Sequence, residues 1–215
     1  MDLDRLNDKQ RDAVEHLDGP MLILAGAGSG KTRVLTTKVA YLLQNRDISP
    51  RNILAITFTN KAAKEMKERI YGLLGREAFL IQISTFHSFG LKLLKENYEV
   101  LGYDNNFTII DADDSLTVIK KIMKEQDIDA NKFNPKAIKA SISDNKNEMV
   151  SVKEYEKFVY TEYDEVVYKV YDEYEKSLKR SNAIDFDDLL ILPLKLFNEH
   201  KEVMESIKNN INMYL

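Results

Sequence analysis

Short apolar runs alternate with amphipathic stretches along the first half of this 215-residue chain. Residues 21–25 form a continuous apolar run bounded by Gly and Pro, which is typical of a buried strand, and residues 53–57 and 80–84 have the same character. Between these runs, apolar residues recur at helical spacing over 31–44 and 61–74. Buried strands that alternate with helices form βαβ units, so the pattern predicts an α/β fold with a parallel sheet flanked by helices.

The pattern changes after about residue 111, where no further strong strand is predicted. Helical periodicity covers 115–126, 135–143, 151–180 and 185–198, which indicates a mostly helical subdomain inserted into the α/β core. Tyrosines are dense among charged residues in 151–180. They indicate either a surface on which bases stack or a helix bundle that buries Tyr on amphipathic faces, and the acidic character of the region favours the bundle.

The composition limits the class of protein and its compartment. Apolar residues make up 44% of the chain, enough for a proper core, and the absence of Cys excludes disulfides, thiolate zinc sites and cysteine nucleophiles. The N-terminus does not resemble a signal peptide, and no apolar run approaches membrane-spanning length. We therefore expect a soluble cytoplasmic protein with no membrane partner.

The net charge of −4 is distributed unevenly along the chain. Residues 31–76 contain ten Lys or Arg and three Asp or Glu, a net charge of +7, whereas the rest of the chain is acidic. A basic segment of this kind either binds an anionic partner or keeps a helix surface solvated. Charge alone favours the second interpretation.

The clearest motif joins the first predicted strand to the first predicted helix. It reads Ala25-Gly26-Ala27-Gly28-Ser29-Gly30-Lys31-Thr32. Glycines allow successive backbone N–H groups to surround an anion, and the helix N-terminus adds partial positive charge. Lys31 is expected to reach the β- and γ-phosphates, and the Thr32 hydroxyl to bind Mg²⁺. Ala25 stands where the strict motif has Gly, but the strand–loop–helix context still predicts a nucleoside triphosphate site.

Hydrolysis of a nucleotide also needs a carboxylate that holds the metal ion and orients water. The candidate is Asp111, which ends the apolar run 107–111. Asp111, followed closely by Asp113 and Asp114, is also typical of a helix N-cap, and we favour that interpretation. It leaves the chain without a water-activating residue.

Five segments together resemble the N-terminal part of superfamily 1 DNA helicases of the UvrD/PcrA/Rep group. They are Leu6-Asn-Asp-Lys-Gln10, the phosphate loop through Arg33, Ala55-Ile-Thr-Phe-Thr-Asn-Lys-Ala-Ala-Lys-Glu-Met66, Ile83-Ser-Thr-Phe-His-Ser88 and Asp185-Phe-Asp-Asp-Leu189. They follow the order of the family and span the whole chain. The Thr-Phe-Thr-Asn-Lys-Ala-Ala segment is highly specific.

The resemblance implies a fold and an activity. It implies an incomplete P-loop NTPase domain of the RecA-like type over 1–108 and 184–215, with a helical subdomain over 109–183. The activity implied is that of an ATP-dependent 3′–5′ DNA helicase in repair or replication, which acts on single-stranded DNA and at single/double-strand junctions. Family members are several times longer, and their Asp-Glu motif would follow Leu215. The resemblance therefore implies a fragment that binds ATP, lacks its C-terminal helicase domains and does not unwind DNA alone.

The resemblance also assigns roles to individual residues. Gln10 would read the adenine edge, and Arg33 would lie near the nucleotide. Lys31 and Thr32 would be the catalytic residues of the loop, with Thr32 on the metal ion. Single-stranded DNA would contact Thr57, Phe58, Thr59, Asn60, Thr85, Phe86, His87 and Phe186, the last as a base-pocket aromatic.

Several of these residues have a purely structural alternative. Asn60 is a good N-cap for the helix that follows it. Phe58 and Phe86 are candidates for the core, and His87 alone would more often be structural. The resemblance favours the DNA-binding interpretation in each case, although Asn60 can serve both purposes.

Two further alternatives remain open. The acids of Asp185-Phe-Asp-Asp188 indicate either a metal site or a helix N-terminus, of which the second is favoured. The chain as a whole is alternatively a stand-alone P-loop nucleotide kinase or an interaction module. A kinase lid needs arginines, and from Asp111 onward the chain contains only Arg180.

Overall fold

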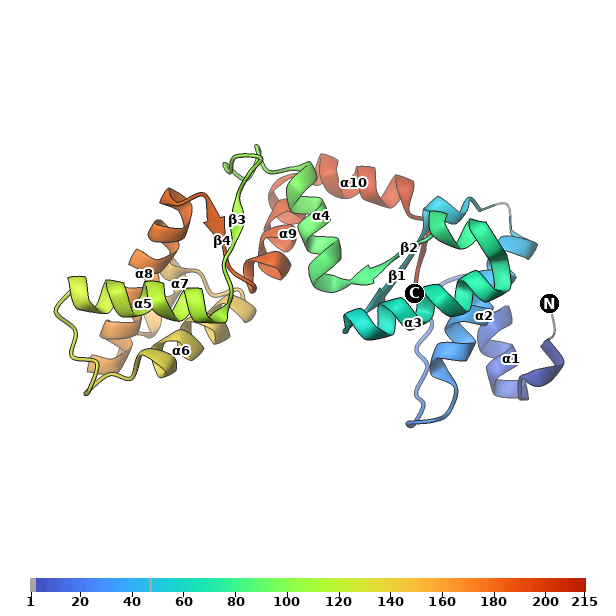
Figure 1. Cartoon of the computed structure of the whole chain (residues 1–215), viewed down its shortest axis with the longest axis horizontal. Helices are drawn as coiled ribbons and strands as arrows, with labels where there is room; N and C mark the ends of the chain where they lie inside the picture. Colours follow the sequence, from blue (N-terminus) through green and yellow to red (C-terminus); the bar gives the residue numbers. More distant parts are fainter. Residues whose placement is uncertain (1–2, 47) are drawn as a thin grey trace. The chain divides into compact units, whose positions relative to one another are not determined.

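The computed structural model describes residues 3–46 and 48–215, which form two compact units. The first contains the chain up to Phe86 together with Glu202–Leu215, and the second contains His87–Lys201 (Figure 1). The predicted division into 1–108 with 184–215 and 109–183 concerns family domains rather than compact units, and it stays a prediction. Among the described residues, no helix is both long enough and apolar enough to cross a membrane.

A three-stranded parallel sheet forms the centre of the first unit. Strand β1 (Ile53–Thr57) lies between β2 (Gln82–Thr85) and β5 (Met213–Tyr214). Two of the predicted strands are therefore confirmed, although β2 begins later than predicted because a 3₁₀ segment occupies Gly75–Leu80. The sequence pattern does not predict β5, whose two residues are too few to display the strand period.

Helices α2 (Lys31–Asn45) and α3 (Asn60–Leu74) pack with this sheet, as the sequence predicts. Helix α1 (Asp8–Glu15) packs with α2 through a separate small cluster. The shared core of strands and helices consists of Val39, Ile53, Ala55, Ala63, Met66, Ile70, Ala78, Ile81 and Ile83. A mixed α/β fold with a parallel sheet is therefore confirmed.

The strand predicted over residues 21–25 does not form. In the described part of the chain these residues pair with no strand, and the side chains of Leu22 and Leu24 are 83% and 86% exposed. The prediction of a buried strand is wrong here. A strand needs a neighbour with free backbone groups along its length, and β5, the edge of the sheet beside β1, has only two residues.

The second unit is mostly helical, as predicted, and contains one short parallel strand pair. Its elements are α4 (Phe86–Glu96), β3 (Thr108–Ile109), α5 (Ala112–Glu125), α6 (Pro135–Asn147), α7 (Val152–Tyr155), α8 (Glu162–Arg180), β4 (Ala183–Ile184) and α9 (Asp188–Glu199). Helix α10 (Lys201–Asn210) follows in the chain. The apolar run 107–111 therefore contains a short strand, and its partner β4 is one that the sequence pattern does not predict.

The single helix predicted over 151–180 is interrupted. A 3₁₀ segment, Glu156–Phe158, follows α7, and α8 starts only after Thr161. The Thr161 hydroxyl accepts a hydrogen bond from the backbone N–H of Asp164 (3.2 Å), and the Asp164 carboxylate accepts one from the N–H of Thr161 (2.9 Å). This capping box satisfies two backbone donors at the start of a helix, so a new helix begins there.

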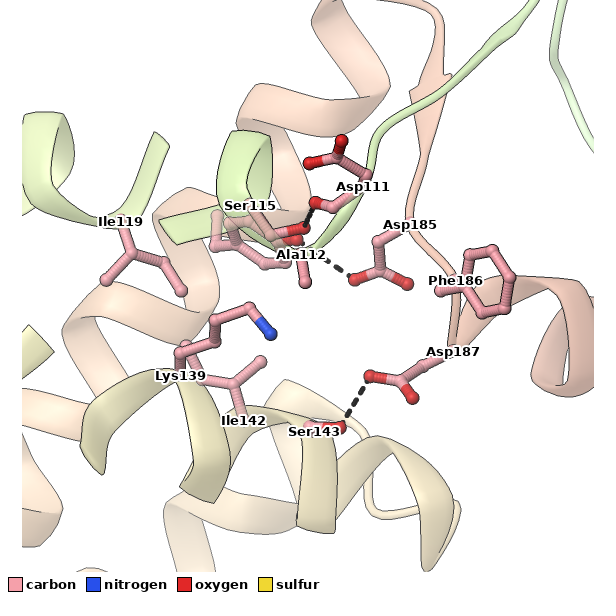
Figure 2. A pocket seen from close by; sticks show the side chains of 11 residues that line it. Asp111, Ala112, Ser115, Ile119, Lys139, Ile142, Ser143, Asp185, Phe186 and Asp187 are labelled. Carbon is pink, nitrogen blue, oxygen red and sulfur yellow. Dashed lines mark hydrogen bonds between the residues drawn. The ribbon is translucent and has the colours of Figure 1, made fainter. Parts of the chain in front are cut away.

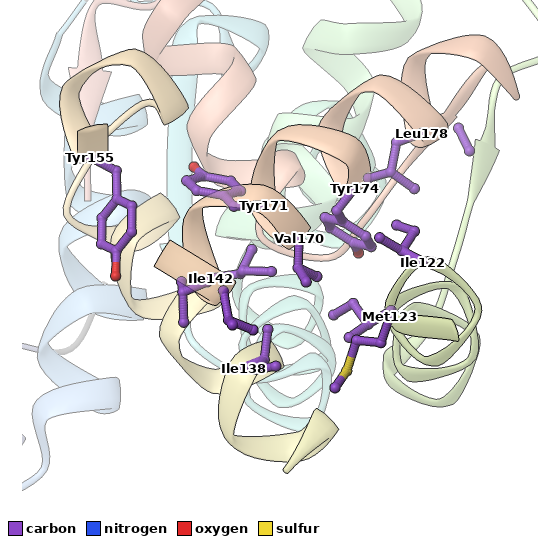
Figure 3. Packing of buried hydrophobic residues seen from close by; sticks show 13 residues of the cluster. Ile122, Met123, Ile138, Ile142, Tyr155, Val170, Tyr171, Tyr174 and Leu178 are labelled. Atoms are coloured by element: carbon purple, nitrogen blue, oxygen red, sulfur yellow. The ribbon is translucent and has the colours of Figure 1, made fainter. Parts of the chain in front are cut away.

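Tyrosines contribute to the core of the second unit (Figure 3). Tyr155, Tyr171 and Tyr174 are buried together with Ile, Val and Met side chains from α5, α6 and α8. The Tyr171 hydroxyl donates to the carbonyl of Val150 (3.1 Å), and the Tyr174 hydroxyl donates to Asp185 Oδ2 (3.0 Å). Because the hydroxyls of Tyr171 and Tyr174 are satisfied, these two rings can be buried at little cost, which confirms the helix-bundle interpretation for them.

Candidate nucleotide and nucleic-acid sites

The glycine-rich loop turns back on itself before α2. Gly28 and Gly30 have φ angles of +75° and +86°, in the left-handed region that residues with a Cβ rarely adopt. A Cβ on Gly30 would in addition lie 3.0 Å from Gln10 Nε2. The glycines at these two positions are therefore required by the backbone path of the loop.

The Lys31 side chain folds over this loop. Its ammonium donates hydrogen bonds to the carbonyls of Ala25 (2.8 Å) and Gly26 (2.6 Å), and the Ser29 hydroxyl donates to the same Gly26 carbonyl (2.7 Å). Thr32 is the next residue of α2 and is half-buried. The structure thus places one cation and one hydroxyl at the start of the helix that follows the loop.

The N-terminus of α2 receives no hydrogen bond from a capping side chain. The first-turn N–H groups of a helix attract anions, and here they lie beside the Lys31 ammonium and the Thr32 hydroxyl. The N–H and ammonium donors fit a phosphate group, and the hydroxyl oxygen of Thr32 is the kind of ligand that Mg²⁺ takes. Lys31 and the backbone N–H groups would hold phosphate oxygens, and Thr32 would hold the metal ion.

Gln10 connects α1 to the loop. Its side-chain oxygen accepts a hydrogen bond from the Asn7 backbone N–H (3.1 Å), and its Nε2 donates to the carbonyl of Ser29 (3.0 Å). Together with the Asn7 side chain, Gln10 forms a capping box at the start of α1. The Asn-x-x-Gln spacing would have predicted this helix start. The role of Gln10 in reading adenine stays a prediction.

In the first unit, two aromatic rings follow directly after the carboxyl ends of β1 and β2. Phe58 is 88% exposed and Phe86 is 44% exposed, and their ring centroids lie 5.5 Å apart. The alternative that these residues belong to the core is therefore wrong. Thr57 and Thr85 are register partners at the same strand ends, but the Thr85 side chain is buried.

The start of α3 differs in one detail from the prediction. Thr59, not Asn60, is the N-cap residue, and its hydroxyl accepts a hydrogen bond from the N–H of Ala62 (3.1 Å). Asn60 is the first residue of the helix and is exposed. The N-cap alternative for Asn60 is therefore wrong, because Thr59 already fills that position.

The basic segment 31–76 presents most of its positive charge to solvent. Lys38 is the exception: it is buried, and its ammonium donates to the carbonyls of Ala13 and His16. Burial lowers the pKa of Lys38. Asp47, one of the three acids in the segment, lies outside the described residues. Helix α3 alone carries four exposed cations, Lys61, Lys64, Lys67 and Arg69.

In the second unit, Phe186 lies against His87. The ring of Phe186 is 57% exposed, and its centroid lies 4.8 Å from that of His87. Gly90, on the same helix as His87, makes this approach possible. A Cβ on Gly90 would lie 1.9 Å from the carbonyl oxygen of Leu189 on α9, so only glycine allows the two helices to come this close.

A cavity of about 370 Å³ lies beside Phe186 and is lined by residues of α5, α6, α8 and the turn before α9 (Figure 2). At its edge, Asp111 Oδ1 accepts hydrogen bonds from the N–H groups of Asp113 (2.8 Å) and Asp114 (2.9 Å). This confirms that Asp111 is the N-cap of α5. The Lys139 ammonium points into the cavity.

The acids of the 185–188 turn form the start of α9. The N–H of Asp188 donates to Asp185 Oδ1 (2.9 Å), and the N–H of Asp185 donates to Asp188 Oδ2 (3.1 Å). This confirms the interpretation as a helix N-terminus. In the described part of the chain, no group of three or more His, Asp or Glu is arranged to hold a metal ion.

Lys146, on α6, lies buried among these acids. Its ammonium lies 2.7 Å from Asp188 Oδ1, 2.9 Å from Asp185 Oδ2 and 3.0 Å from Glu175 Oε1. No motif in the sequence predicts a role for this residue. The signal was its spacing, since Lys146 continues the buried face of α6 that begins with Ile138 and Ile142.

Burial and charge act against each other in this cluster. Burial alone would lower the pKa of Lys146, but Asp188, Glu175 and Asp185 together raise it well above its usual value. Burial, together with the negative charge of Asp185 and Glu175, raises the pKa of Asp188 to about 7. The positive charge of Lys146 lowers this pKa but offsets the rise only in part. The cluster therefore holds an additional proton below neutral pH.

Known proteins match this chain over nearly its whole length. The UvrD/REP helicase N-terminal domain family matches residues 6–215. The chain is 46% identical over 207 residues to an ATP-dependent DNA helicase PcrA of Staphylococcus aureus (strain Mu50), and 49% identical over 203 residues to one of Bacillus subtilis (strain 168). These alignments cover 96% and 94% of this chain but only 28% of each relative.

The first prediction concerns nucleotide affinity. Replacing Lys31 by Ala removes the ammonium that lies over the loop, so we expect ATP binding to weaken by about 1.5–3 kcal/mol, the usual scale for a charge-assisted contact. Isothermal titration calorimetry measures this, with Lys64→Ala, an exposed lysine of α3, as the control. Gln10→Ala should reduce the preference for adenine over other bases. Equal ATP affinity of the wild type and Lys31→Ala would contradict the assignment of the loop.

The second prediction concerns pH. Between about pH 4 and 7, Asp188 keeps its proton in the folded state but loses it in the unfolded state, so its contribution to the free energy of unfolding falls as pH rises. Asp188→Asn removes this dependence. Urea denaturation should show that the free energy of unfolding of the wild type, relative to that of Asp188→Asn, is lower at pH 8 than at pH 5. Asp144→Asn, at an exposed position of α6, should follow the wild type. A constant difference between wild type and Asp188→Asn would contradict the raised pKa.

Proposed function

Because the chain belongs to the UvrD/REP helicase family, we propose that it is the N-terminal ATP-binding part of an ATP-dependent DNA helicase. The whole protein would translocate 3′–5′ along single-stranded DNA and act at single/double-strand junctions in repair or replication, in the cytoplasm. The observation that carries the proposal is the glycine-rich loop with Lys31 folded over it at the start of α2. The relatives are named as ATP-dependent DNA helicases, and the chain spans 28% of their length, so unwinding would need further helicase domains.

In this proposal the residues of the loop bind the triphosphate of ATP. The ammonium of Lys31 would exchange its two carbonyl partners for β- and γ-phosphate oxygens, which are stronger acceptors. The backbone N–H groups of residues 25–30 and the first turn of α2 would hold the remaining oxygens. Thr32 would hold Mg²⁺, which neutralises phosphate charge when bound. Gln10 and Arg33 would lie near the nucleotide, Gln10 at the adenine edge.

The proposed DNA contacts come from both units. In the first, the exposed pair Phe58 and Phe86 offers ring faces to bases, and the cations of α3 offer charge to phosphates. Hydroxyl and amide groups would contact the DNA backbone. In the second, the exposed ring of Phe186 would contact a base beside His87. The polar contacts proposed are Thr57, Thr59, Asn60 and Thr85, of which Thr85 would have to become accessible because its side chain is buried.

The third prediction concerns DNA affinity. Phe58→Ala should weaken binding of a single-stranded oligonucleotide by about 1–3 kcal/mol, the usual contribution of one base stacked on an aromatic ring. Wild-type binding should also weaken strongly with salt, because the cations of α3 would release ions from the DNA. Fluorescence anisotropy of labelled oligo(dT) at two salt concentrations measures both effects, and Phe79→Ala, an exposed ring on Gly75–Leu80, is the control. Binding whose affinity does not change with salt would contradict the assignment of this surface to DNA. A preference for duplex DNA that is unaffected by Phe58→Ala would contradict it too.

The fourth prediction concerns turnover. Phosphoryl transfer needs a carboxylate that orients water and positive charge from an arginine finger, whose loss alone costs on the order of 10³–10⁵ in rate. Asp111 is engaged as the N-cap of α5. We therefore expect the 215-residue chain to bind ATP but to hydrolyse it at near background rates and not to unwind a duplex.

Steady-state ATP hydrolysis with and without single-stranded DNA measures this turnover. Robust hydrolysis that DNA stimulates, and that disappears in Lys31→Ala, would show instead that the chain is catalytically complete. Asp111 would then become the candidate for the missing carboxylate, and Asp111→Asn would test it.

A further inference from the structure

The turn that carries Phe186 is held by side chains of α6, together with Tyr174 of α8, whose hydroxyl donates to Asp185. Asp187 Oδ2 accepts a hydrogen bond from the Ser143 hydroxyl (2.7 Å), and Asp187 Oδ1 accepts one from Asn147 Nδ2 (3.2 Å). The ammonium of Lys146 binds the carboxylates of Asp185 and Asp188. All three acids that surround Phe186 in the sequence are therefore bound by residues of α6.

Phe186 itself has little that fixes its position. More than half of its surface is exposed, and its one ring contact in the described structure is with His87. An exposed aromatic side chain on a turn is mobile unless the backbone beside it is fixed. Here the fixed points are the flanking carboxylates, and the buried ammonium of Lys146 contacts both Asp185 and Asp188.

We propose that Lys146 is a positioning residue for DNA binding, which acts through the 185–188 turn to hold the Phe186 ring ready for a base. This inference rests on the proposed function, which assigns Phe186 as a DNA contact. Lys146 does not touch DNA in this scheme. Its ammonium neutralises Asp185 and Asp188 on either side of the ring, so that the turn keeps one conformation.

The charge of Lys146 is what the arrangement requires. Without the ammonium, the buried carboxylates of Asp185 and Asp188 would face each other and the partly exposed Glu175 with no cation between them. Buried carboxylates without a cation either take up protons or draw in water, and in both cases the ion pairs that fix the turn are lost. A mobile Phe186 would then have to be ordered each time a base binds, which lowers affinity by about threefold to tenfold.

The chain offers a direct reporter of this position, because it contains no Trp. Phe186→Trp introduces a single tryptophan in the turn, beside His87, which can be excited selectively over the eleven tyrosines of the chain. In that background, Lys146→Met should lower the fluorescence anisotropy of the tryptophan and change its quenching by His87, and Lys146→Arg should restore both. Lys136→Met, at an exposed position of α6, is the matched control and should change neither. Unchanged tryptophan signals in a folded Lys146→Met protein would overturn the proposal.

A second variant covers the case in which Lys146→Met does not fold, as judged by circular dichroism. Ser143→Ala combined with Asn147→Ala removes the bonds to Asp187, together with those between Asn147 and Ser143, and leaves the residues of the ion cluster in place. It should also lower the fluorescence anisotropy of the tryptophan, but by less than Lys146→Met does. A fully immobile tryptophan in this variant would contradict the control of the turn by α6.

A double-mutant cycle with single-stranded oligo(dT) tests the functional part. Lys146→Met should weaken binding about threefold to tenfold when Phe186 is present and leave it nearly unchanged in a Phe186→Ala background, since the effect passes through that ring. An equal loss in both backgrounds would overturn the positioning role. Failure of the wild type to bind oligo(dT) would instead contradict the proposed function, and the tryptophan experiment, which uses no DNA, would still decide whether Lys146 positions the turn.

Discussion

Parallel pairing of β1 with β2 determines what the first unit presents at the ends of its strands. The register places Thr57 opposite Thr85, so the residues that follow, Phe58 and Phe86, emerge side by side. Parallel strands all end at the same edge of a sheet, and this edge is where open α/β sheets bind ligands. Two segments separated by more than twenty residues in the sequence thus form one aromatic surface.

In the second unit, the buried ammonium of Lys146 is the interaction that determines how the helices meet. Lys146 brings α6, α8 and the start of α9 together, because its three carboxylate partners come from the last two. A buried ion cluster of this kind adds little net stability, since desolvation offsets most of the attraction. What it provides is a defined geometry, because any other arrangement leaves a buried charge without a partner. The exposed Phe186 depends on that geometry.

The nucleotide loop is organised differently, by short-range bonds. Lys31, Ser29 and Gln10 all bind carbonyl groups within the loop, and two glycines in the left-handed conformation close the turn. These contacts hold the loop although no strand has formed before it. The exposed Leu22 and Leu24 show that the apolar segment 21–25 is not needed for the local geometry of the loop.

The sequence by itself determined those features that depend on neighbouring residues. Helices α2, α3 and α5, the strand β1, the Asp111 cap and the glycine-rich loop follow from local periodicity, caps and backbone freedom, and the sequence predicted them closely. The interruption before α8 also has a local cause, the Thr161 capping box, although the periodicity alone did not reveal it.

Only the tertiary structure decided which of these features meet. The strands β4 and β5 have two residues each and exist because a distant segment pairs with them. Whether residues 21–25 form a strand depends on a neighbour in the sheet, which an apolar pattern cannot supply. The burial of Lys38, Lys146 and Thr85 and the exposure of Phe58 are likewise settled by packing partners far away in the chain. The physical reason is common to all of them. Hydrogen bonding and desolvation depend on two surfaces that come into contact, and a segment of sequence describes only its own surface.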